Sequence, residues 1–574
     1  MNIFNKYKNL VLNLIEKNRK KLNLNAEIIN EDITFELPPE KIDSDFSSNI
    51  CLILSKKNKM SPKELATKIK KLIEDNLSDT LIVEIADPCF LNFKLKKLSL
   101  QKSILEIFEA STKYGSNNGN KKYNIEFVSA NPTGPMHIGH CRGAIFGDVL
   151  SNLLKFHGNE VTREYYVNDY GNQIKNFTKS VFLRIREIKY KETFKVEPDL
   201  YPGEYIIDIA KKIINENKKK NFENFQDDFD FLSNKSLSLS MEYIKLDLNK
   251  LGIKHDNFFY ESKIVKENLV QKSIKILQDN NYVSNDFLPK PKGEENKNWK
   301  KIKRLIFKST KFGDDVDRAL QKNDGSWTYF ANDIAYHNDK ILRNYDNLVN
   351  ILGADHTGYI KRINAAVEAL SNSKTKLDCK VCQLVKLHKN GKPLKMSKRS
   401  GDFVTINEVL NNVDKDSIRF IMLSRSNDVE LDFDLNKVLE KNKDNHVFYV
   451  QYCYARIKSL IRTLNLNLKD PIKFHDEKLN LNNYEINILR KIFNWPKVLD
   501  SASKHYEPHR IPFYLYELAT LFHSYWSKGN KDEKYKFVLN NKIKNQNTLA
   551  VIKLLSIVIK NGMKILNVSL PEKM

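Results

Sequence analysis

The chain has 574 residues with 41% hydrophobic content, which is too long for one compact domain, and we expect three domains. Its formal net charge of +24 favours a polyanionic partner such as nucleic acid, although a chain rich in Lys, Asn and Ile throughout explains the charge equally well. The six cysteines have no framework spacing, which argues against a disulfide-stapled secreted fold and for a reducing compartment.

The N-terminal region, residues 1–115, is predicted to be a small α+β domain. Its first 25 residues have charges spread among the apolar positions, which predicts an amphipathic helix rather than a signal peptide or membrane span, so we expect a cytoplasmic protein. PKELATKIKKLIEDNL has helical periodicity, and LIVEIA and FLNFKL are typical of strands. Gly and Asn cluster in YGSNNGNKKYN, which predicts the domain boundary there.

A βαβ unit is predicted from residue 123 onward. NIEFVSA is typical of a strand, NPTGPMHIG of a loop, and the next residues of a helix with Gly158 as its terminator. VTREYYVND predicts a second strand. This order indicates an α/β fold with a Rossmann-type, doubly wound parallel sheet, in which ligands bind at the carboxyl ends of the strands. The NPTGPMHIGH loop lies at such an end.

The rest of the chain is predicted to contain an insertion, the second half of the sheet and a helical region. Residues of about 185–300 are charged and helix-prone, and strand signals return in RLIFKS, SWTYF, LVNILGA and CQLVKLH, so the sheet domain is assigned to residues 116–404. A connecting helical segment (405–447) and a C-terminal helical bundle (448–574) follow. Some aromatic and basic residues of the bundle could either bind an RNA loop or belong to the core: Tyr449, Tyr452, Tyr454, Arg456 and Lys458.

Two histidines in the first loop of the sheet domain fit a triphosphate site. The sequence His137-Ile138-Gly139-His140 lies between a strand and the amino end of a helix, where unpaired N–H groups and the helix dipole favour an anion. Imidazoles there can donate hydrogen bonds to phosphate oxygens, and Gly139 lets a flat base approach the backbone. Taken alone, two histidines at this spacing are more often structural or solvent-facing.

A basic loop late in the same domain fits the leaving pyrophosphate. Residues 395–401 read KMSKRSG, and lysines on a mobile loop can close over the β- and γ-phosphates. Such a charge run is usually a solvated loop, but both motifs occur in this order and in these contexts, which favours an ATP site. Cys379 and Cys382 form a single CxxC motif without a second Cys or His pair at zinc-ligand distance, so no metal site is predicted.

HIGH and KMSKR together resemble the signature pair of the class I aminoacyl-tRNA synthetases. IEFVSANPTGPMHIGHCRGAIFGD, LSRSNDVELDFDL, YVQYCYARI and NGMKILNVSLPEKM resemble the arginyl-tRNA synthetase family in particular. The resemblance extends from the N-terminal domain to Met574 and is weakest in the first hundred residues and the insertion. It implies an ATP-dependent ligase whose N-terminal domain contacts the tRNA elbow and whose C-terminal bundle reads the anticodon. Arg399 follows KMSK, where Ser is commoner in the family.

The chemistry of the arginine side chain limits which residues can form a selective pocket. A guanidinium is planar with five donors and no acceptor, so a selective pocket needs fixed carboxylates and a flat partner. Tyr329 and Asp333 are four residues apart and would share one face of a helix. The resemblance implies that these two and Glu126 surround the guanidinium, that Asn131 holds the α-amino end, and that Asp355 lies beside it. Periodicity alone would also allow Glu126 as a strand-edge acid and Tyr329 as a core aromatic.

The expected reaction is attack of the arginine carboxylate on the α-phosphate of ATP, which gives arginyl-adenylate and pyrophosphate without a protein nucleophile. His137 and His140 would stabilise the α-phosphate region, Lys395 and Lys398 the pyrophosphate, and substrate-associated Mg²⁺ the phosphates. The resemblance also implies transfer through the 2′-hydroxyl of the terminal adenosine of tRNA(Arg), and a first step that requires bound tRNA. A monomer is expected. The predicted ATP-binding residues are Asn131, Pro132, Thr133, Gly134, Pro135, Met136, His137, Ile138, Gly139, His140, Lys395, Met396, Ser397 and Lys398.

Two other functions remain open from the sequence. A cysteinyl synthetase would resemble this chain but would hold a zinc ion, whereas the lone CxxC motif here precedes the KMSK loop. A non-catalytic RNA-binding protein of the same fold would show salt-sensitive RNA binding without pyrophosphate exchange. The intact histidines and lysines of the two motifs argue against it.

Overall fold

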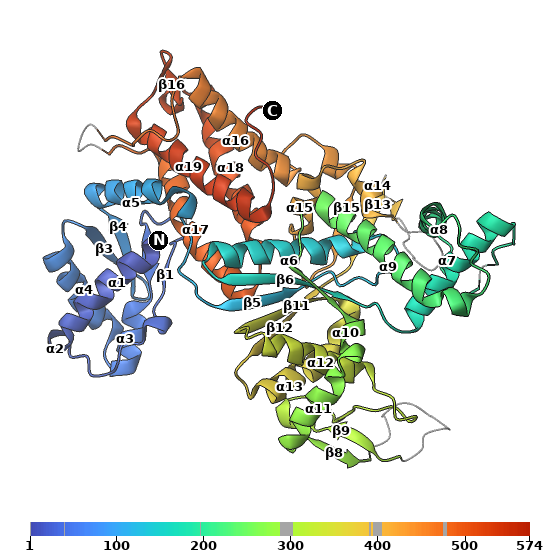
Figure 1. Cartoon of the computed structure of the whole chain (residues 1–574). Coiled ribbons are helices and arrows are strands. Elements are labelled where there is room, and N and C mark those ends of the chain that lie inside the picture. Colours follow the sequence, from blue (N-terminus) through green and yellow to red (C-terminus); the bar gives the residue numbers. More distant parts are fainter. Residues whose placement is uncertain are drawn as a thin grey trace. The chain divides into compact units, whose positions relative to one another are not determined.

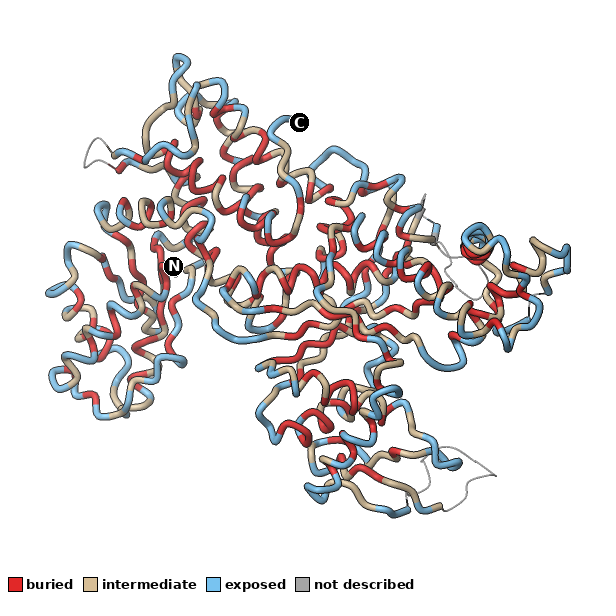
Figure 2. Tube along the Cα trace, viewed as in Figure 1, coloured by how far each residue is buried: buried red, intermediate tan, exposed pale blue. Residues whose placement is uncertain are grey.

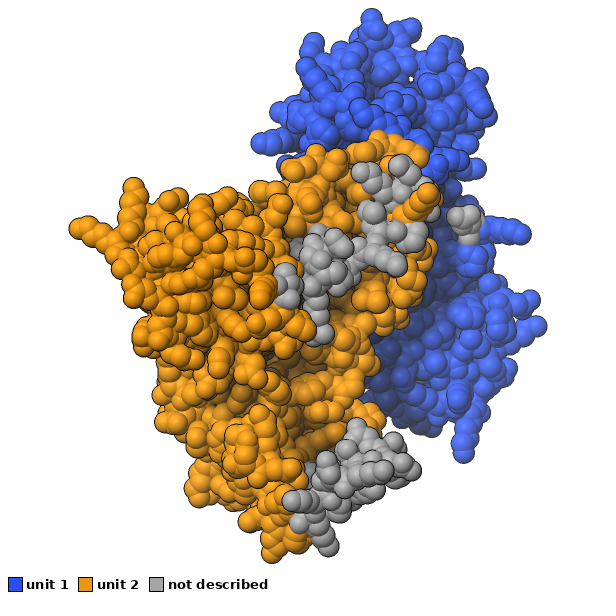
Figure 3. Space-filling model, turned by 90° about the vertical axis from the view of Figure 1, so that its right-hand side faces the viewer, with its two compact units in different colours: residues 1–117, 441–505, 510–574 blue, residues 118–440, 506–509 orange. Residues whose placement is uncertain are grey.

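The computed structural model describes the chain except for residues 1, 40, 196, 288–301, 390–391, 394–403 and 475–478. The chain divides into two compact units, which are coloured separately in Figure 3. Unit 1 contains both ends of the chain (Met1–Asn117, Lys441–His505 and Arg510–Met574), and unit 2 contains Asn118–Glu440 and Tyr506–His509. The boundary after Asn117 falls in the predicted YGSNNGNKKYN loop, while the other predicted domain boundaries stay predictions.

Unit 2 is built on a parallel five-stranded sheet (Figure 1). Its strands are β5 (Lys122–Glu126), β6 (Glu160–Val167), β7 (Asn257–Tyr260), β11 (Asn347–Gly353) and β12 (Lys376–Cys382). Their order is β12-β11-β5-β6-β7, and all neighbouring pairs are parallel. The strand order reverses between β5 and β11, which confirms the predicted doubly wound fold. The loops after these two strands open onto the crevice where such sheets bind ligands.

Helix α6 (Ile138–Phe156) follows β5 and is buried along most of its length. The sequence produces this burial through apolar residues at helical spacing, all of them fully buried: Ile145, Val149, Leu150, Leu153 and Leu154. The helix ends before Gly158, whose positive φ of 86° makes it the predicted terminator. Gly147 faces the Phe127 ring so closely that a Cβ atom there would lie 2.2 Å from it. This close approach fixes α6 against the loop that follows β5.

Helices α11 (Leu269–Asp279), α12 (Tyr329–Leu342) and α13 (Ile360–Ser371) share an apolar core with β11, and the short α10 (Glu261–Lys266) precedes them. Beside them, β8 (Val283–Asp286), β9 (Arg304–Phe307) and β10 (Arg318–Ala319) form a separate antiparallel sheet. RLIFKS does form a strand, but it lies in this small sheet rather than in the central sheet as predicted. CQLVKLH likewise forms the strand β13 (Val385–Lys389) in another small sheet rather than in the central one.

SWTYF is not a strand, and it contributes only an isolated bridge between Trp327 and Gln321. Thr328 caps the following helix because its side chain accepts a hydrogen bond from the Ala331 N–H at 3.3 Å, and α12 therefore begins at Tyr329. The hydrogen bond from the capping residue thus outweighs the β-propensity of the aromatic residues in this segment.

Helices α7 (Asn172–Tyr190), α8 (Glu204–Glu216) and α9 (Phe225–Lys250) lie between β6 and β7 in the chain and have a core of their own. The charged segment of about 185–300 is therefore helical over much of its length, while β7, within that range, belongs to the central sheet.

The last part of unit 2 contains the elements that precede and follow the KMSK motif in the chain. It contains β13 (Val385–Lys389), β14 (Lys392–Pro393), α14 (Ile406–Leu410), α15 (Lys415–Met422) and β15 (Leu431–Asp434). The three strands form one sheet in the order β14-β13-β15. The segment 405–447, predicted as helical, thus also contributes the strand β15 to a sheet.

Unit 1 begins with an α+β part, as predicted. Its elements are α1 (Ile3–Lys17), α2 (Arg19–Leu22), β1 (Phe35–Glu36), β2 (Phe46–Ser48), α3 (Ile50–Asn58), α4 (Pro62–Leu77), β3 (Leu81–Ala86), β4 (Phe90–Leu95) and α5 (Lys97–Ala110). The strands form an antiparallel sheet in the order β1-β2-β4-β3. The predicted amphipathic helix at the start is α1, which buries one apolar face.

The C-terminal part of unit 1 is a helical bundle with a small hairpin. Its elements are α16 (His446–Thr463), α17 (Asn483–His505), α18 (Arg510–Lys531), β16 (Val538–Leu539), β17 (Lys542–Ile543) and α19 (Gln546–Leu566). Figure 2 shows that buried positions run along most of α19. Short 3₁₀ helices complete the chain at Asn30–Asp32, Ser111–Lys113, Ser309–Phe312, Ala354–Tyr359, Lys437–Leu439 and Glu533–Tyr535. None of the helices in the described ranges is long and apolar enough to cross a membrane.

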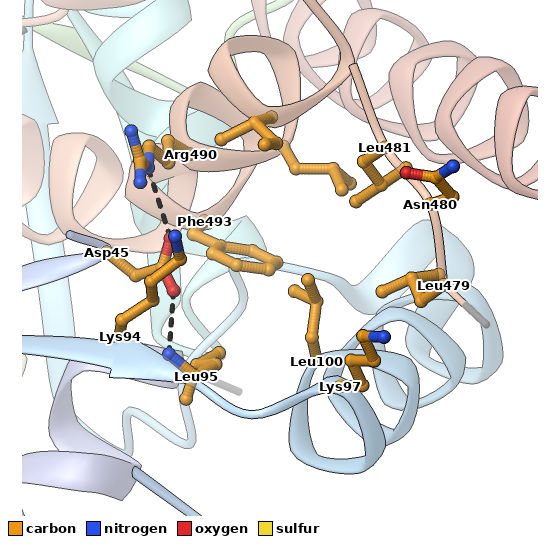
Figure 4. A pocket seen from close by; sticks show the side chains of 12 residues that line it. Asp45, Lys94, Leu95, Lys97, Leu100, Leu479, Asn480, Leu481, Arg490 and Phe493 are labelled. Atoms are coloured by element: carbon orange, nitrogen blue, oxygen red, sulfur yellow. Dashed lines mark hydrogen bonds and ion pairs between the residues drawn. The ribbon is translucent and has the colours of Figure 1, made fainter. Parts of the chain in front are cut away.

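Contacts between its two sequence-distant parts make unit 1 one body. The Tyr114 hydroxyl donates to the Ile492 carbonyl oxygen at 2.9 Å, and the Asn561 side chain donates to the Ser111 carbonyl oxygen at 3.0 Å. A cavity of about 180 Å³ (Figure 4) has Asp45 on its wall, which accepts hydrogen bonds from the Leu95 N–H at 2.8 Å and from Arg490 at 3.1 Å.

Candidate active site

The HIGH sequence forms the first turn of α6, at the carboxyl end of β5. His137 is the residue that precedes the helix, and its backbone N–H donates to His140 Nδ1 at 3.3 Å. The two imidazole rings stack with their centroids 3.8 Å apart and their planes at 19°. A Cβ atom on Gly139 would lie 3.0 Å from the His137 ring, so a side chain there would crowd the pair. Two imidazoles therefore stand together at a helix amino end, which favours an anionic ligand.

The loop between β5 and α6 contains backbone strain. Val128 and Ser129 have positive φ angles of 72° and 39°, which L-residues rarely adopt and which cost roughly 1–3 kcal/mol each. The strained turn aims the Ser129 hydroxyl at Glu126 Oε1, 3.1 Å away, and the same hydroxyl accepts from the Tyr166 N–H at 3.1 Å. Strain of this kind persists where surrounding structure enforces it, and here it orients a predicted site residue.

The remaining predicted ATP-binding residues of this loop form its wall. The Asn131 carbonyl accepts from the Thr133 N–H at 2.8 Å, which closes a tight turn. The residues that are buried are Pro132, Thr133, Gly134, Met136 and Ile138, whereas Gly139 is exposed and Asn131, Pro135, His137 and His140 are half-buried. The exposed backbone of Gly139 beside the two imidazoles leaves this turn open to a ligand.

Backbone hydrogen bonds join the HIGH turn to the chain that follows the KMSKR motif. The Ile138 N–H donates to the Val404 carbonyl oxygen at 3.3 Å, and the Ile406 N–H donates to the Met136 carbonyl oxygen at 3.1 Å. The Met136 N–H in turn donates to Asp247 on α9 at 3.1 Å, and burial raises the pKa of this carboxyl to about 6. Lys395, Met396, Ser397 and Lys398 themselves lie outside the described residues.

Arg142, one turn further along α6, contacts the base of the same region. Its buried guanidinium donates to the carbonyl oxygens of Gln383 at 3.0 Å, Ser426 at 2.7 Å and Val429 at 2.6 Å. Gln383 lies two residues before the β13-β14 hairpin that leads to the KMSKR motif. The helix that carries the histidines is thus bonded to the chain on both sides of that motif.

Glu126 and Asp333, predicted guanidinium acceptors, lie near each other in unit 2. Asp333 is on α12, where its carboxylate accepts a hydrogen bond from the Tyr359 hydroxyl. Burial raises the pKa of Asp333 to about 7, with the hydrogen bond from Tyr359 lowering it and the nearby charge of Glu126 raising it. Glu126 ends β5 and forms an ion pair with Lys340 at 2.6 Å. The structure therefore brings the two carboxylates together, and one of them already has a cationic partner.

Tyr329 and Asp355 are more exposed than the other predicted residues. Tyr329 is 76% exposed at the start of α12, one helical turn from Asp333, and the Lys322 ammonium lies 5.6 Å from its ring centroid. The shared helix face is as predicted, and the alternative of a core aromatic is excluded. Asp355 follows β11, and its largely exposed carboxylate lies 3.4 Å from His356 Nε2. The chain positions Asp355 at the switch point of the sheet, but its side chain faces solvent.

The sequence prediction missed two residues that contact the acceptors, Lys340 and Tyr359. Lys340 lies seven residues after Asp333, so helical spacing in DIAYHNDK would have indicated it. Tyr359 is in the LGADHTGY stretch, but the sequence contains no signal that links its hydroxyl to Asp333.

The two cysteines of the CxxC motif lie on β12, where Cys382 is buried and Cys379 is half-buried. Burial raises the pKa of Cys379 and of Cys382 to about 12, and the Cys379 thiol lies 3.9 Å from the Asn364 amide oxygen. Within the part of the chain that the structure describes, no three His, Cys, Asp or Glu side chains group as a metal site.

Three family models together match almost the whole chain. "tRNA synthetases class I (R), catalytic domain" matches residues 103–460, "Arginyl tRNA synthetase N terminal domain" matches residues 9–95, and "DALR anticodon binding domain" matches residues 450–574.

Curated relatives and solved structures give the same result. The chain is 51% identical to the arginine–tRNA ligase of Pelagibacter ubique (strain HTCC1062) and 42% identical to that of Wolbachia pipientis wMel, with 100% of both chains covered in each comparison. It resembles the crystal structure of a putative arginyl-tRNA synthetase from Campylobacter jejuni with a TM-score of 0.73 at 30% identity, over 84% of this chain and 100% of the other. The arginyl-tRNA synthetase of Thermus thermophilus shares the fold, with a TM-score of 0.71 at 18% identity over 99% and 100% of the chains.

Proposed function

This chain belongs to the arginine–tRNA ligase family of the class I synthetases, and we propose that the loop after β5 and the adjoining face of α12 form its site of arginine activation. The observation that carries the proposal is the pair His137 and His140 at the amino end of α6, with the half-buried acceptor Asp333 in the same unit. The reaction joins arginine and ATP to arginyl-adenylate and pyrophosphate, and then transfers arginine to the terminal adenosine of tRNA(Arg).

The arginine side chain would bind by its guanidinium. Asp333 offers a carboxylate oxygen fixed by Tyr359, Glu126 offers a second acceptor at the end of β5, and the exposed ring of Tyr329 offers a flat surface. A planar fork of donors can bond two such carboxylates at once. Asn131, at the turn after β5, would hold the α-amino end, and Asp355 would approach it from β11.

The chemical step needs positioning and charge stabilisation. A carboxylate oxygen of arginine attacks the α-phosphorus of MgATP, the bond from this phosphorus to the bridging oxygen breaks, and pyrophosphate leaves with the electron pair. His137 and His140, which stack at the amino end of α6, would donate hydrogen bonds to the α-phosphate and stabilise the charge that develops. No side chain is required as a nucleophile.

Lys395 and Lys398 would stabilise the leaving pyrophosphate. Support comes from the described residues on both sides of their motif. Val404 is hydrogen-bonded to the HIGH turn, and Gln383 is hydrogen-bonded to Arg142 on the same helix. The chain before and after the lysines is thus anchored to the helix that carries the histidines.

The C-terminal bundle would hold the anticodon of the tRNA. The Arg456 guanidinium lies 4.3 Å from the ring centroid of Tyr452 and 5.2 Å from that of Trp526, and all three are half-buried on α16 and α18. Such a stack can continue onto an unpaired base. Tyr454 is buried and belongs to the core, while Lys458 forms an ion pair with Glu572 at 2.7 Å. A monomeric state and a cytoplasmic location stay predictions.

Exchange of labelled pyrophosphate into ATP tests this function directly. With tRNA added, the purified chain should support exchange with arginine, and each of the other amino acids should give a far smaller rate. The same measurement without tRNA tests whether the first step requires it. Lys398→Ala should bind arginine normally yet lose much of its rate. Exchange with another amino acid and none with arginine would refute the proposed specificity, and unchanged turnover of the variant would remove Lys398 from the mechanism.

A further inference from the structure

Lys340 is a fully buried cation beside the proposed guanidinium acceptors. Its ammonium forms an ion pair with Glu126 Oε2 at 2.6 Å, donates to the Asn350 amide oxygen at 3.1 Å, and lies 4.3 Å from the centroid of the Tyr336 ring. Burying an ammonium costs free energy unless such partners replace its water. A charged side chain at this position therefore depends on the contacts with Glu126, Asn350 and Tyr336.

A chain of hydrogen bonds connects Lys340 to the backbone carbonyl oxygen of Asp333 within α12. Asn350, which accepts from Lys340, contacts His337 Nε2 at 2.9 Å, and His337 Nδ1 contacts the Asp333 carbonyl oxygen at 2.8 Å. Burial lowers the pKa of His337 to about 4, so this imidazole is neutral at ordinary pH. Because α12 supplies Asp333, His337 and Lys340, the network fixes the Lys340 ammonium, and with it Glu126, relative to the backbone of Asp333.

The two carboxylates differ in the hydrogen bonds and ion pairs that they already form within the protein. Glu126 accepts from Ser129 through one oxygen and is paired with Lys340 through the other. Asp333 accepts from the Tyr359 hydroxyl and, among the described residues, has no ion pair. A ligand therefore meets one carboxylate that already has a cation and one that does not.

We propose that Lys340 is a specificity-determining residue, which admits a guanidinium beside Glu126 and Asp333 but disfavours the primary ammonium of lysine. This inference rests on the proposed arginine site. A guanidinium spreads its charge over three nitrogens, and it can donate hydrogen bonds to Asp333 and to Glu126 at the same time. An ammonium is a compact, strongly hydrated point charge, and beside Glu126 it would meet the like charge of Lys340 at low dielectric.

The test is pyrophosphate exchange with tRNA added, in which kcat/KM is measured for arginine, lysine and ornithine. Lys340→Met should lower kcat/KM for arginine about tenfold or more, because Glu126 loses its support. The preference for arginine over lysine should fall by roughly tenfold to hundredfold, the size expected when a nearby like charge is removed. Lys263→Met is the matched control, since Lys263 on α10 pairs at 3.3 Å with Asp339, which lies on α12 beside Lys340. It should keep the preference of the wild type.

Lys340→Gln provides a second variant, because glutamine can still donate to Glu126 but has no charge. Its folding is checked by circular dichroism, and calorimetric binding of arginine and of lysine gives the preference without catalysis. A folded variant of either kind with the wild-type preference would overturn the proposal. A wild-type chain that does not activate arginine at all would instead refute the proposed function.

Discussion

Arginine binding should depend on pH through Asp333. The ligand guanidinium stays cationic across the physiological range, and it interacts with Asp333 as a carboxylate rather than as a neutral acid. Since burial raises the pKa of Asp333 to about 7, part of the free enzyme is protonated there at neutral pH. Binding must release that proton, so affinity rises with pH up to about 7 and is flat above it.

The magnitude follows from the position of this pKa. One unit below it, only about one tenth of the free enzyme carries the charged carboxylate, so arginine should bind roughly tenfold more weakly at pH 6 than at pH 8. Tyr359→Phe removes the hydrogen bond that lowers the pKa of Asp333, so the midpoint should move to higher pH.

Calorimetric titration of arginine between pH 5.5 and 8.5 measures both effects, and the enthalpy in buffers of different ionisation enthalpy counts the protons released. Asp333→Asn is the control, because an amide does not titrate. Affinity that is constant from pH 6 to pH 8, or a pH dependence that survives in Asp333→Asn, would show that this carboxyl does not bind the guanidinium. The nearby Glu261, whose pKa is also raised by burial, would then be the next group to test.

Three further substitutions probe catalysis and stability. His140→Ala should lower kcat for pyrophosphate exchange about a hundredfold with little change in the KM for arginine; an unchanged kcat would exclude a role at the α-phosphate. Gly147→Ala should destabilise unit 2 by about 1–3 kcal/mol in urea, because its Cβ would meet the Phe127 ring; unaltered unfolding would contradict the close approach. Arg419→Met should cost about 3–5 kcal/mol in the same measurement, since Asp148 would lose its fully buried partner at 2.5 Å and keep only the longer contact with Arg163 at 3.4 Å, and a neutral effect would mean that the pair adds nothing.

Much of the catalytic fold could be predicted because its signals are local. Helix α6 follows from apolar spacing and Gly158, and β5, β6 and β11 follow from short apolar runs. The strand prediction at SWTYF was wrong, because aromatic residues suit both strands and helices and the hydrogen bond at Thr328 decides between them.

The site could be predicted only in part. The histidine pair and Asp333 have recognisable local sequences, whereas the contacts of the carboxylates Asp333 and Glu126 join distant segments. Tyr359 reaches Asp333 from the loop after β11, and Lys340 reaches Glu126 from another element of the chain. Such pairings depend on the packing of α12 against the sheet, which no single stretch of sequence encodes.

Unit 1 is assembled from the two ends of the chain, and this has a consequence for its biosynthesis. The bonds from Tyr114 to Ile492 and from Asp45 to Arg490 require residues that leave the ribosome long after the first 117. At 5–20 residues per second, the intervening stretch of about 320 residues takes roughly 15–65 s to synthesise. Throughout that interval the apolar surface meant for α17 and α19 is uncovered on the nascent chain. Chaperone binding during translation is therefore expected at the amino-terminal segment, and release only after the last helix has emerged.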